Sequence, residues 1–128
     1  MTTRLHGPIL IVDDDPALRE GLCVLLETRG YPAITAANGA EALAALRAGL
    51  RPCLIVLDLM MPVRDGIQFR EEQRHDKAIA DIPVVILSAR SDSEQYVEQL
   101  GAVGHMSKSP LDTNALMTVI RQHYAPIS

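Results

Sequence analysis

The amino-acid sequence predicts an α/β protein built as a three-layer sandwich, with a five-stranded parallel sheet between two layers of helices. Short apolar runs alternate with segments of helical periodicity five times along the chain, a pattern typical of parallel sheets. The central runs are continuously apolar, as expected of strands covered on both faces. With helices on both faces, we expect the strand order 2-1-3-4-5. The 128 residues, 48% of them apolar, predict one domain over residues 1–128, with a core from about 8 to 124.

The first two strand–helix units have clear boundaries. The run PILIV at residues 8–12 predicts a strand, and Pro16, preceded by an aspartate, is suited to the first turn of a helix. Leucines at helical spacing follow, and Gly30 ends this helix. A weaker strand at 31–37 contains a proline, which favours an edge position in the sheet, and a helix follows at 38–49.

The remaining units follow the same alternation. The runs CLIVLD and IPVVILS predict buried strands, and the short AVGHM run predicts a strand of weaker character. We expect, in chain order, a strand at 53–58, a helix from Asp65 or Gly66 to about Arg74, a strand at 82–88, a helix at 91–101, a strand at 102–106 and a helix at 112–124.

Composition limits the classes of function. The net charge is −4 with dispersed arginines, which disfavours direct binding to nucleic acid. No apolar run approaches the roughly 18 residues that span a bilayer, and no signal peptide is recognisable, so we expect a cytoplasmic protein without membrane contact. Cys23 and Cys53 lie within apolar runs, which predicts buried, reduced thiols.

Three acidic residues follow strands that we expect to be neighbours. Asp13 and Asp14 end the first strand, and Asp58 ends the third. Adjacent parallel strands lie about 4.8 Å apart, so these carboxylates converge on one patch and repel one another. Mg²⁺ relieves this repulsion, and it commonly joins carboxylates to a phosphoryl group. The acidic cluster therefore predicts Mg²⁺ as cofactor and a phosphate as partner.

Two further polar residues are expected at the same edge of the sheet. Ser88 ends the fourth strand and Lys108, one of only two lysines, follows the fifth. Individually, the aspartates are explained as helix or loop caps, the serine as a turn residue and the lysine as a surface charge. Together, carboxylates, hydroxyl and ammonium predict a phosphoryl-transfer site with an aspartate as nucleophile.

The motifs ILIVDDDP, VLDLMMPVRDG, VVILSA and GAVGHMSK closely resemble the receiver domain of bacterial response regulators. The resemblance extends from about Pro8 to Tyr124 and implies a flavodoxin-like fold of the kind found in chemotaxis receiver proteins. It implies phosphorylation on Asp58, with Lys108 and Ser88 contacting the phosphoryl group. It also implies that Mg²⁺ is bound by Asp13, Asp14, Asp58 and the backbone carbonyl of Met60.

The resemblance also implies the partners of a two-component signalling system. Receiver domains take phosphate from a phosphohistidine on a sensor kinase or phosphotransfer protein, so the chain is expected to promote only its own phosphorylation and dephosphorylation rather than act as an enzyme. The face formed by the fourth helix, fifth strand and fifth helix is then expected to rearrange, to bind a downstream protein and to offer a dimer contact. Ser88 and position 105 are the expected switch residues.

The sequence departs from the family pattern at three places. Ser109 separates Lys108 from Pro110, where the family has Lys-Pro, so the geometry of the Ser109–Pro110 bond stays open. The switch position on the fifth strand is His105 in place of Tyr or Phe, so a switching and a non-switching role both stay open. Met60 and Arg90 occupy positions that influence hydrolysis of the acyl phosphate; because Met60 cannot orient a water, we expect slow self-dephosphorylation, and Met60→Asn should accelerate the decay.

Alternative functions stay open at this stage. Asp13 and Asp15 form a D-x-D pair resembling that of haloacid dehalogenase-type phosphatases, whose nucleophile would be Asp13, although Ala17 departs from that pattern. A flavin-binding flavodoxin relative is disfavoured, because its phosphate loop should not be acidic. A receiver-like module that binds partners without phosphorylation is a further alternative. The kinase, the output and the oligomeric state are not readable from the sequence, nor whether the chain acts alone or within a larger regulator.

Overall fold

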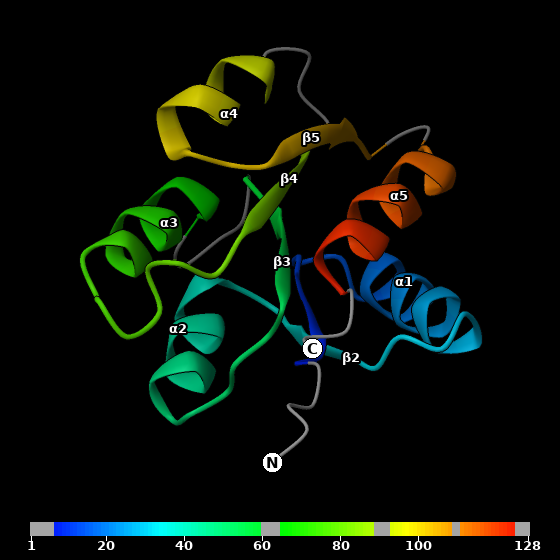
Figure 1. Ribbon diagram of the computed structural model, residues 1–128, viewed down its shortest axis with the longest axis horizontal. Helices are drawn as coiled ribbons and strands as arrows, with labels where there is room; N and C mark the ends of the chain where they lie inside the picture. The colour runs from blue at the N-terminus through cyan, green and yellow to red at the C-terminus, as the bar shows by residue number, and fades with distance from the viewer. Residues whose placement is uncertain (1–6, 60–64, 89–92, 109–110, 125–128) are drawn as a thin grey trace.

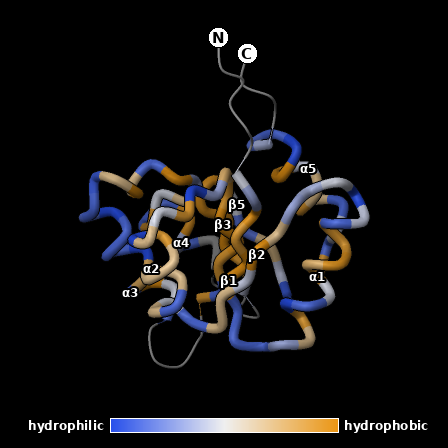
Figure 2. Tube along the Cα trace, turned by 90° about the horizontal axis from the view of Figure 1, so that it is seen from below, coloured by the Kyte–Doolittle hydropathy of each residue, from blue (hydrophilic) through white to orange (hydrophobic). Residues whose placement is uncertain are grey.

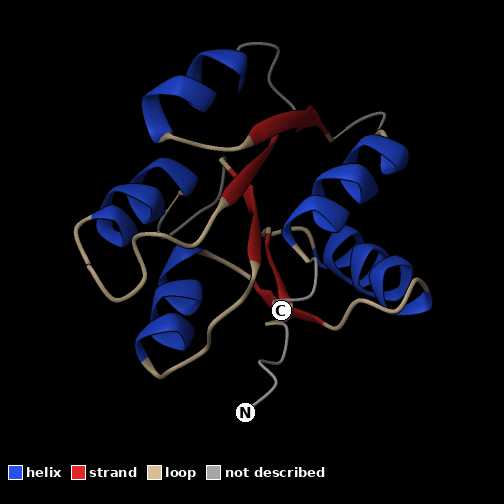
Figure 3. Ribbon diagram, viewed as in Figure 1, coloured by secondary structure: helices blue, strands red, loops and turns tan. Residues whose placement is uncertain are grey.

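The computed structural model describes residues 7–59, 65–88, 93–108 and 111–124, without the side chains of residues 93 and 94. Within them, a five-stranded parallel sheet has the order β2-β1-β3-β4-β5; four helices connect successive strands, and a fifth follows the last strand (Figure 3). The predicted fold class and strand order are confirmed. The elements are β1 (Ile9–Val12), α1 (Pro16–Thr28), β2 (Ala33–Ala36), α2 (Gly39–Arg47), β3 (Leu54–Asp58), α3 (Gly66–Arg74), β4 (Val84–Ser88), α4 (Ser93–Leu100), β5 (Gly104–Ser107) and α5 (Thr113–His123).

Helices cover both faces of the sheet (Figure 1). Helices α1 and α5 lie on one face, and α2, α3 and α4 lie on the other. The strands β1, β3 and β4 are buried at every position, which explains why their sequences are continuously apolar instead of alternating. Along the chain, the apolar segments therefore gather in the centre of the molecule, with polar segments around them (Figure 2).

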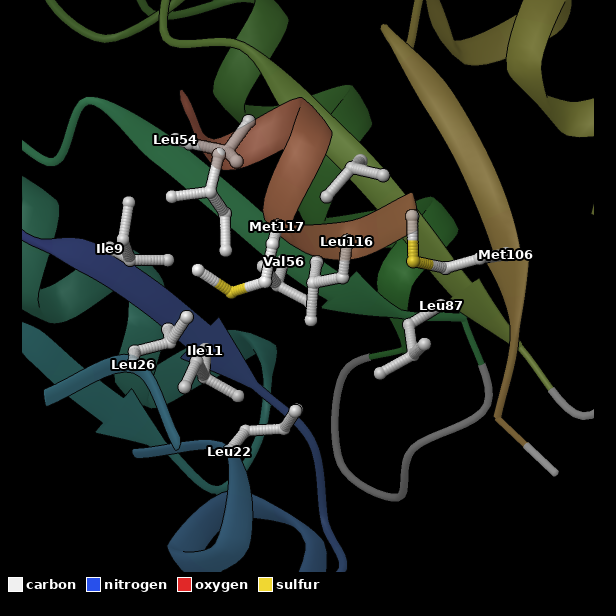
Figure 4. Close-up of a cluster of buried hydrophobic side chains, with 12 residues drawn as sticks. Ile9, Ile11, Leu22, Leu26, Leu54, Val56, Leu87, Met106, Leu116 and Met117 are labelled. Carbon is white, nitrogen blue, oxygen red and sulfur yellow. The ribbon is translucent and has the colours of Figure 1, made fainter. Parts of the chain in front are cut away.

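Two large apolar clusters hold the layers together. Alternate strand residues pack against α1 and α5 in the cluster of Figure 4, where Leu26 of α1 and Met117 of α5 face Ile11 and Val56. The other strand residues pack against α2 and α3, with the fully buried Phe69 of α3 among them. Because burial of one such side chain contributes roughly 1.5–3 kcal/mol, these clusters supply most of the stability of the sandwich.

Short polar residues begin four of the helices, as the sequence indicates. Asp15 accepts backbone hydrogen bonds at the start of α1, Asn38 at the start of α2 and Asp112 at the start of α5. Asp65 and Gln68 form a reciprocal capping box at the start of α3. These caps fix where each helix begins, and therefore the length of the loop that follows each strand.

The boundaries of β5 are shifted from those expected. The strand begins at Gly104 and extends to Ser107, whereas 102–106 was expected. Ala102 belongs to the turn that ends α4, because its N–H donates to the carbonyl of Val97. The apolar character of Ala102 comes from packing beneath α4 and not from a place in the strand.

The predicted burial of the two cysteines is wrong. Cys23 and Cys53 are free thiols, as expected, but both are only half-buried. Cys23 faces β2, a strand at the edge of the sheet, and its thiol lies 3.9 Å from the carbonyl oxygen of Ala33. Cys53 directly precedes β3 and so lies outside the fully covered part of that strand. None of the helices that the structure describes has the length and apolarity needed to span a bilayer.

Candidate functional site

Three carboxylates meet where β1 and β3 end. Val12 and Leu57 are register partners, so Asp13 and Asp58, which follow them, lie side by side at one edge of the sheet. Ligand oxygens of Asp13, Asp14 and Asp58 all lie within 4.8 Å of one another. Asp13 and Asp58 are buried, whereas Asp14 is exposed. The predicted convergence of the three acids is therefore present in the structure.

Lys108 brings a positive charge into this cluster from the opposite side. Its Nζ lies 3.0 Å from Oδ2 of Asp13 and 3.2 Å from Oδ2 of Asp58. The stem of the lysine is partly covered, with 19% of the side chain exposed. One ammonium group therefore neutralises part of the charge of two buried carboxylates.

The position of Lys108 follows from the pairing of β4 and β5. Ser88 and Ser107 are register partners at the ends of these strands, and the N–H of Lys108 donates to the carbonyl oxygen of Ser88 at 3.0 Å. This hydrogen bond extends the pairing by one residue beyond β5. It directs the lysine side chain across the sheet edge toward the acids.

The electrostatics of the site favour a charged lysine. Burial by itself lowers the pKa of Lys108, because the ammonium loses hydration. The hydrogen bond to Asp13 and the negative charges of Asp58 and Asp13 outweigh this effect, and the pKa is raised above its ordinary value. The lysine therefore stays protonated throughout the neutral range.

One oxygen of Asp13 has unused capacity to bind a cation. Its Oδ1 accepts hydrogen bonds from the N–H of Asp15 at 2.9 Å and from Nζ of Lys108. Its Oδ2 is buried and makes no hydrogen bond with any residue the structure describes, although the lysine ammonium lies near it. A buried carboxylate oxygen without a donor is costly, and a hard cation would satisfy it. The donor set, all oxygen and close together, fits Mg²⁺.

The other predicted site residues have different outcomes. Ser88 is fully buried at the end of β4, next to β3, as expected for a residue at this edge. His105 is exposed on β5, where it is the register partner of Ile86. Met60, Arg90 and the Ser109–Pro110 bond lie outside the described residues, so the predictions that concern them stay predictions.

Sequence reasoning missed two residues that shape the site. The N–H of Gly66 donates to the carbonyl oxygen of Leu59 at 3.0 Å, and a Cβ at this position would overlap the carbonyl oxygen of Asp58 and lie 2.8 Å from Cα of Leu59. Arg19 of α1 donates from Nη1 to the backbone carbonyl of Asp13 at 2.7 Å. A glycine directly after a helix-capping aspartate is the only signal in the sequence for the first contact.

Comparison with known families places the chain in one of them. Residues 9–121 match the family model described as the response regulator receiver domain. The match covers all five strands and all of the aspartates discussed above, as well as Ser88 and Lys108.

Curated relatives belong to the same class. The DNA-binding dual master transcriptional regulator RpaA of Synechocystis is 36% identical over 115 residues, which cover 88% of this chain and 47% of that protein. The alkaline phosphatase synthesis transcriptional regulatory protein PhoP of Bacillus subtilis is 38% identical over 120 residues, covering 91% of this chain and 49% of that protein. The chain thus spans about half the length of the curated relatives it matches.

Solved structures of response regulators have the same fold as this chain. A response regulator receiver protein from Pseudomonas putida has a TM-score of 0.84 with 28% identity and covers 93% of this chain and 98% of its own. The response regulator TrrA of Thermotoga maritima, solved in complex with Mg²⁺ and BeF, has a TM-score of 0.78 with 32% identity, covering 91% and 97%. The chain belongs to the response regulator receiver domain family, the phosphoacceptor regulators of two-component signal transduction.

Proposed function

We propose that Asp58 is the phosphoacceptor of this receiver domain, with Asp13, Asp14 and Asp58 holding Mg²⁺ together with the backbone carbonyl of Met60. The observation that supports this most directly is the meeting of three carboxylates and one ammonium at a single edge of the sheet. The two buried acids lie side by side, and the lysine ammonium contacts Oδ2 of both. Asp58 is the last residue of β3, whereas Asp13 follows the end of β1. Asp13 has its Oδ1 engaged by the backbone of Asp15 and is better suited to hold a cation.

The transfer itself is a displacement at phosphorus. One oxygen of the Asp58 carboxylate attacks the phosphorus of a phosphohistidine, the new P–O bond forms, and the P–N bond breaks with its electron pair returning to the imidazole. When bound, Mg²⁺ supplies positive charge that stabilises the phosphoryl oxygens. Lys108 lies within reach of the same oxygens and Ser88 offers a hydroxyl from the neighbouring strand end, so both would contact the transferred group.

The donor in this proposal is a sensor histidine kinase or a histidine phosphotransfer protein, and the recipient of the signal is a downstream protein. Phosphate adds negative charge and acceptor oxygens that draw Ser88 and Lys108 toward Asp58. Because these residues end β4 and follow β5, their movement changes the surface formed by α4, β5 and α5, with His105 exposed on it. This surface is the proposed site for target binding and for a homodimer.

Two predictions from the sequence stay predictions. The chain is expected to make no direct contact with nucleic acid, since the DNA binding named for some relatives is a property of proteins about twice as long. A cytoplasmic location is also expected. The haloacid dehalogenase-type phosphatase is not favoured, because the family model that matches is a different one.

The acceptor is tested by labelling the chain with acetyl phosphate and Mg²⁺, then reducing the acyl phosphate with borohydride and mapping the modified residue by mass spectrometry. We expect a single modification on Asp58, absent from Asp58→Asn and absent when EDTA replaces Mg²⁺. Modification of Asp13 together with turnover of added phosphoesters would instead indicate a phosphatase. A chain that is never modified by acetyl phosphate or by a cognate kinase would be a binding module without phosphorylation.

A further inference from the structure

A buried arginine of α3 binds the C-terminal end of α4. Arg70 is 6% exposed, and its guanidinium donates from Nε to the carbonyl oxygen of Leu100 at 2.8 Å and from Nη2 to that of Gly101 at 3.2 Å. The last carbonyls of a helix have no partner within the helix, so these two bonds satisfy groups that would otherwise need water. A planar fork of donors is suited to binding two adjacent carbonyls at once.

A second arginine repeats this contact one turn later on α3. Arg74 donates from Nη1 to the carbonyl oxygen of Gln99 at 3.1 Å. Three consecutive carbonyls at the end of α4 therefore accept from α3. The last turn of α4 has no basic residue of its own, so the two arginines also supply the positive charge that favours the C-terminal end of a helix dipole.

The buried arginine is itself held in place by a glutamine. Nη1 of Arg70 donates to Oε1 of Gln73 at 2.8 Å, and Nε2 of Gln73 donates to the carbonyl oxygens of Ile79 and Ile82 at 2.9 and 3.1 Å. Gln73 is fully buried. Burial, and secondarily the charge of Arg74, lower the pKa of Arg70, and no carboxylate pairs with it among the residues that the structure describes. Burying a charged group without an acidic partner costs free energy, and the hydrogen bonds of Arg70 to backbone carbonyls offset this cost.

The most deeply buried side chain among those described for α4 lies at the same end. Of its side chains described here, those of residues 95–100, only Leu100 is buried, at 2% exposure. Tyr96 and Val97 are partly exposed and pack against the small cluster of Leu59, Ile86 and Leu100. Helix α4 begins at Ser93, five positions after Ser88, the residue expected to meet the phosphoryl group.

The helix that supplies the arginines is joined to the acceptor strand. α3 begins at Gly66, whose N–H donates to the carbonyl oxygen of Leu59 and where an added Cβ would overlap the carbonyl oxygen of Asp58. Through α3, the C-terminal end of α4 is therefore connected to the end of β3, which carries the acceptor.

We propose that Arg70 and Arg74 fix the C-terminal end of α4 to α3, so that phosphorylation of Asp58 moves α4 as a pivot about that end, with displacement confined to its N-terminal end. This inference rests on the proposed function, because it takes phosphorylation as the stimulus. The arginines are positioning residues: they touch neither phosphate nor metal and act through the orientation of α4.

The test is hydrogen exchange by mass spectrometry on the whole chain, with and without Mg²⁺ and beryllofluoride. In the wild type, beryllofluoride should change exchange in the first turn of α4 and leave unchanged the amides of Gly101 and Ala102, which donate to Glu98 and Val97. Arg70→Lys keeps the positive charge but removes the guanidinium that binds two carbonyls at once. The amide hydrogen-exchange rates of residues 97–102 should therefore rise on the order of tenfold in the protein without beryllofluoride. The beryllofluoride response should then spread to these residues as well.

The matched variants are Arg74→Ala and Arg121→Ala. Both arginines are exposed, but within the part of the chain that the structure describes Arg121 bonds only inside its own helix α5, to the hydroxyl of Thr118. Arg74→Ala should accelerate exchange at the end of α4 and Arg121→Ala should not. Equal beryllofluoride responses at both ends of wild-type α4, or equal exchange in the two alanine variants, would overturn the proposal.

The outcome for the proposed function is read separately, from the rise in melting temperature that beryllofluoride binding produces in the wild type. Absence of that rise refutes both the acceptor site and the pivot. The hydrogen-exchange rates of the variants without beryllofluoride still decide whether the arginines hold the end of α4. If Arg70→Lys does not fold, the comparison of Arg74→Ala with Arg121→Ala decides alone.

Discussion

Lys108 Nζ lies 3.2 Å from Oδ2 of Asp58, although 50 positions separate the two residues in the chain. The contact exists because β3 and β4 are neighbours, as are β4 and β5, so their C-terminal ends share one edge of the sheet. The same ammonium lies 3.0 Å from Oδ2 of Asp13. Lys108, which follows β5, thus contacts the carboxylates at the ends of both β1 and β3. Its replacement should therefore affect stability as well as signalling.

Replacement of Lys108 by methionine should destabilise the chain in EDTA by on the order of 2 kcal/mol, because two buried carboxylates lose their counter-charge. The loss is smaller than for a fully buried pair, since 19% of the lysine side chain is exposed. Urea unfolding measures the difference. Saturating Mg²⁺ should recover a large part of it, because the cation replaces the missing charge; a loss of equal size with and without Mg²⁺ would point to packing instead.

Above neutral pH, the stabilising effect of Lys108 should decline only in the alkaline range. Its pKa is raised in the folded chain, so its contribution is complete below the ordinary value of 10.5 and is lost as pH rises through the folded-state value. The difference in unfolding free energy between wild type and Lys108→Met should therefore be constant near neutrality and decline above 10.5. A decline that begins near neutral pH would contradict the raised pKa.

Mg²⁺ should raise the melting temperature of the wild-type chain through the acidic cluster. A ligand at about a hundred times its dissociation constant adds roughly 2.7 kcal/mol to the free energy of unfolding. Asp13→Asn and Asp14→Asn should each reduce this Mg²⁺-dependent gain, measured by differential scanning calorimetry. Asp15→Asn is the matched control: it removes an adjacent carboxylate, but asparagine still caps α1, so the Mg²⁺ response should persist. A response lost equally in all three variants would indicate general charge screening.

Gly66→Ala should distort the acceptor strand end. The added Cβ would overlap the carbonyl of Asp58 and meet Cα of Leu59 at 2.8 Å, so the backbone must shift at a cost of about 2–3 kcal/mol. Labelling of Asp58 by acetyl phosphate should slow at the same time. Gly21→Ala in α1 is the control, because a Cβ there would meet no atom within 4 Å beyond the backbone of its own helix; this change should stabilise the chain by roughly 0.5–1 kcal/mol. Equal effects of the two substitutions on labelling would show that Gly66 has no special role.

The sequence sufficed to predict the sheet and the meeting of the acids, because both follow from local patterns and from topology. Continuous apolar runs indicate buried parallel strands, and the strand order then brings Asp13 beside Asp58 and Lys108 toward both. The hydrogen bond between the N–H of Lys108 and the carbonyl oxygen of Ser88, one residue beyond β5, directs the lysine side chain toward the acids. It depends on the register of β4 and β5, which the sequence pattern does not determine.

The hydrophobic periodicity of the sequence did not predict side-chain contacts between elements that are distant in the chain. Arg70 lies on a helical turn after Ile67, and arginine at such a position is ordinarily exposed. Its burial depends on the carbonyls of Leu100 and Gly101, 30 and 31 residues away. The close approach of Gly66 to Asp58 likewise depends on the path of a loop. These features arise from tertiary packing, which periodicity does not encode.

Cys53 should react slowly with alkylating agents despite its partial exposure. Burial raises the pKa of its thiol to about 11, an effect that the backbone hydrogen bond of the residue only partly offsets. The thiolate is the reactive form, so the rate of reaction with iodoacetamide should keep rising about tenfold per pH unit until near that value. The Cys23→Ala variant isolates this reaction, and the urea-unfolded chain gives the rate of an unperturbed thiol. Because the pKa is raised in the folded chain, stability should fall as pH rises from 9.0 toward 11, and less so in Cys53→Ala. A native rate that levels off near pH 9.0 would show that the thiol is not held in its neutral form.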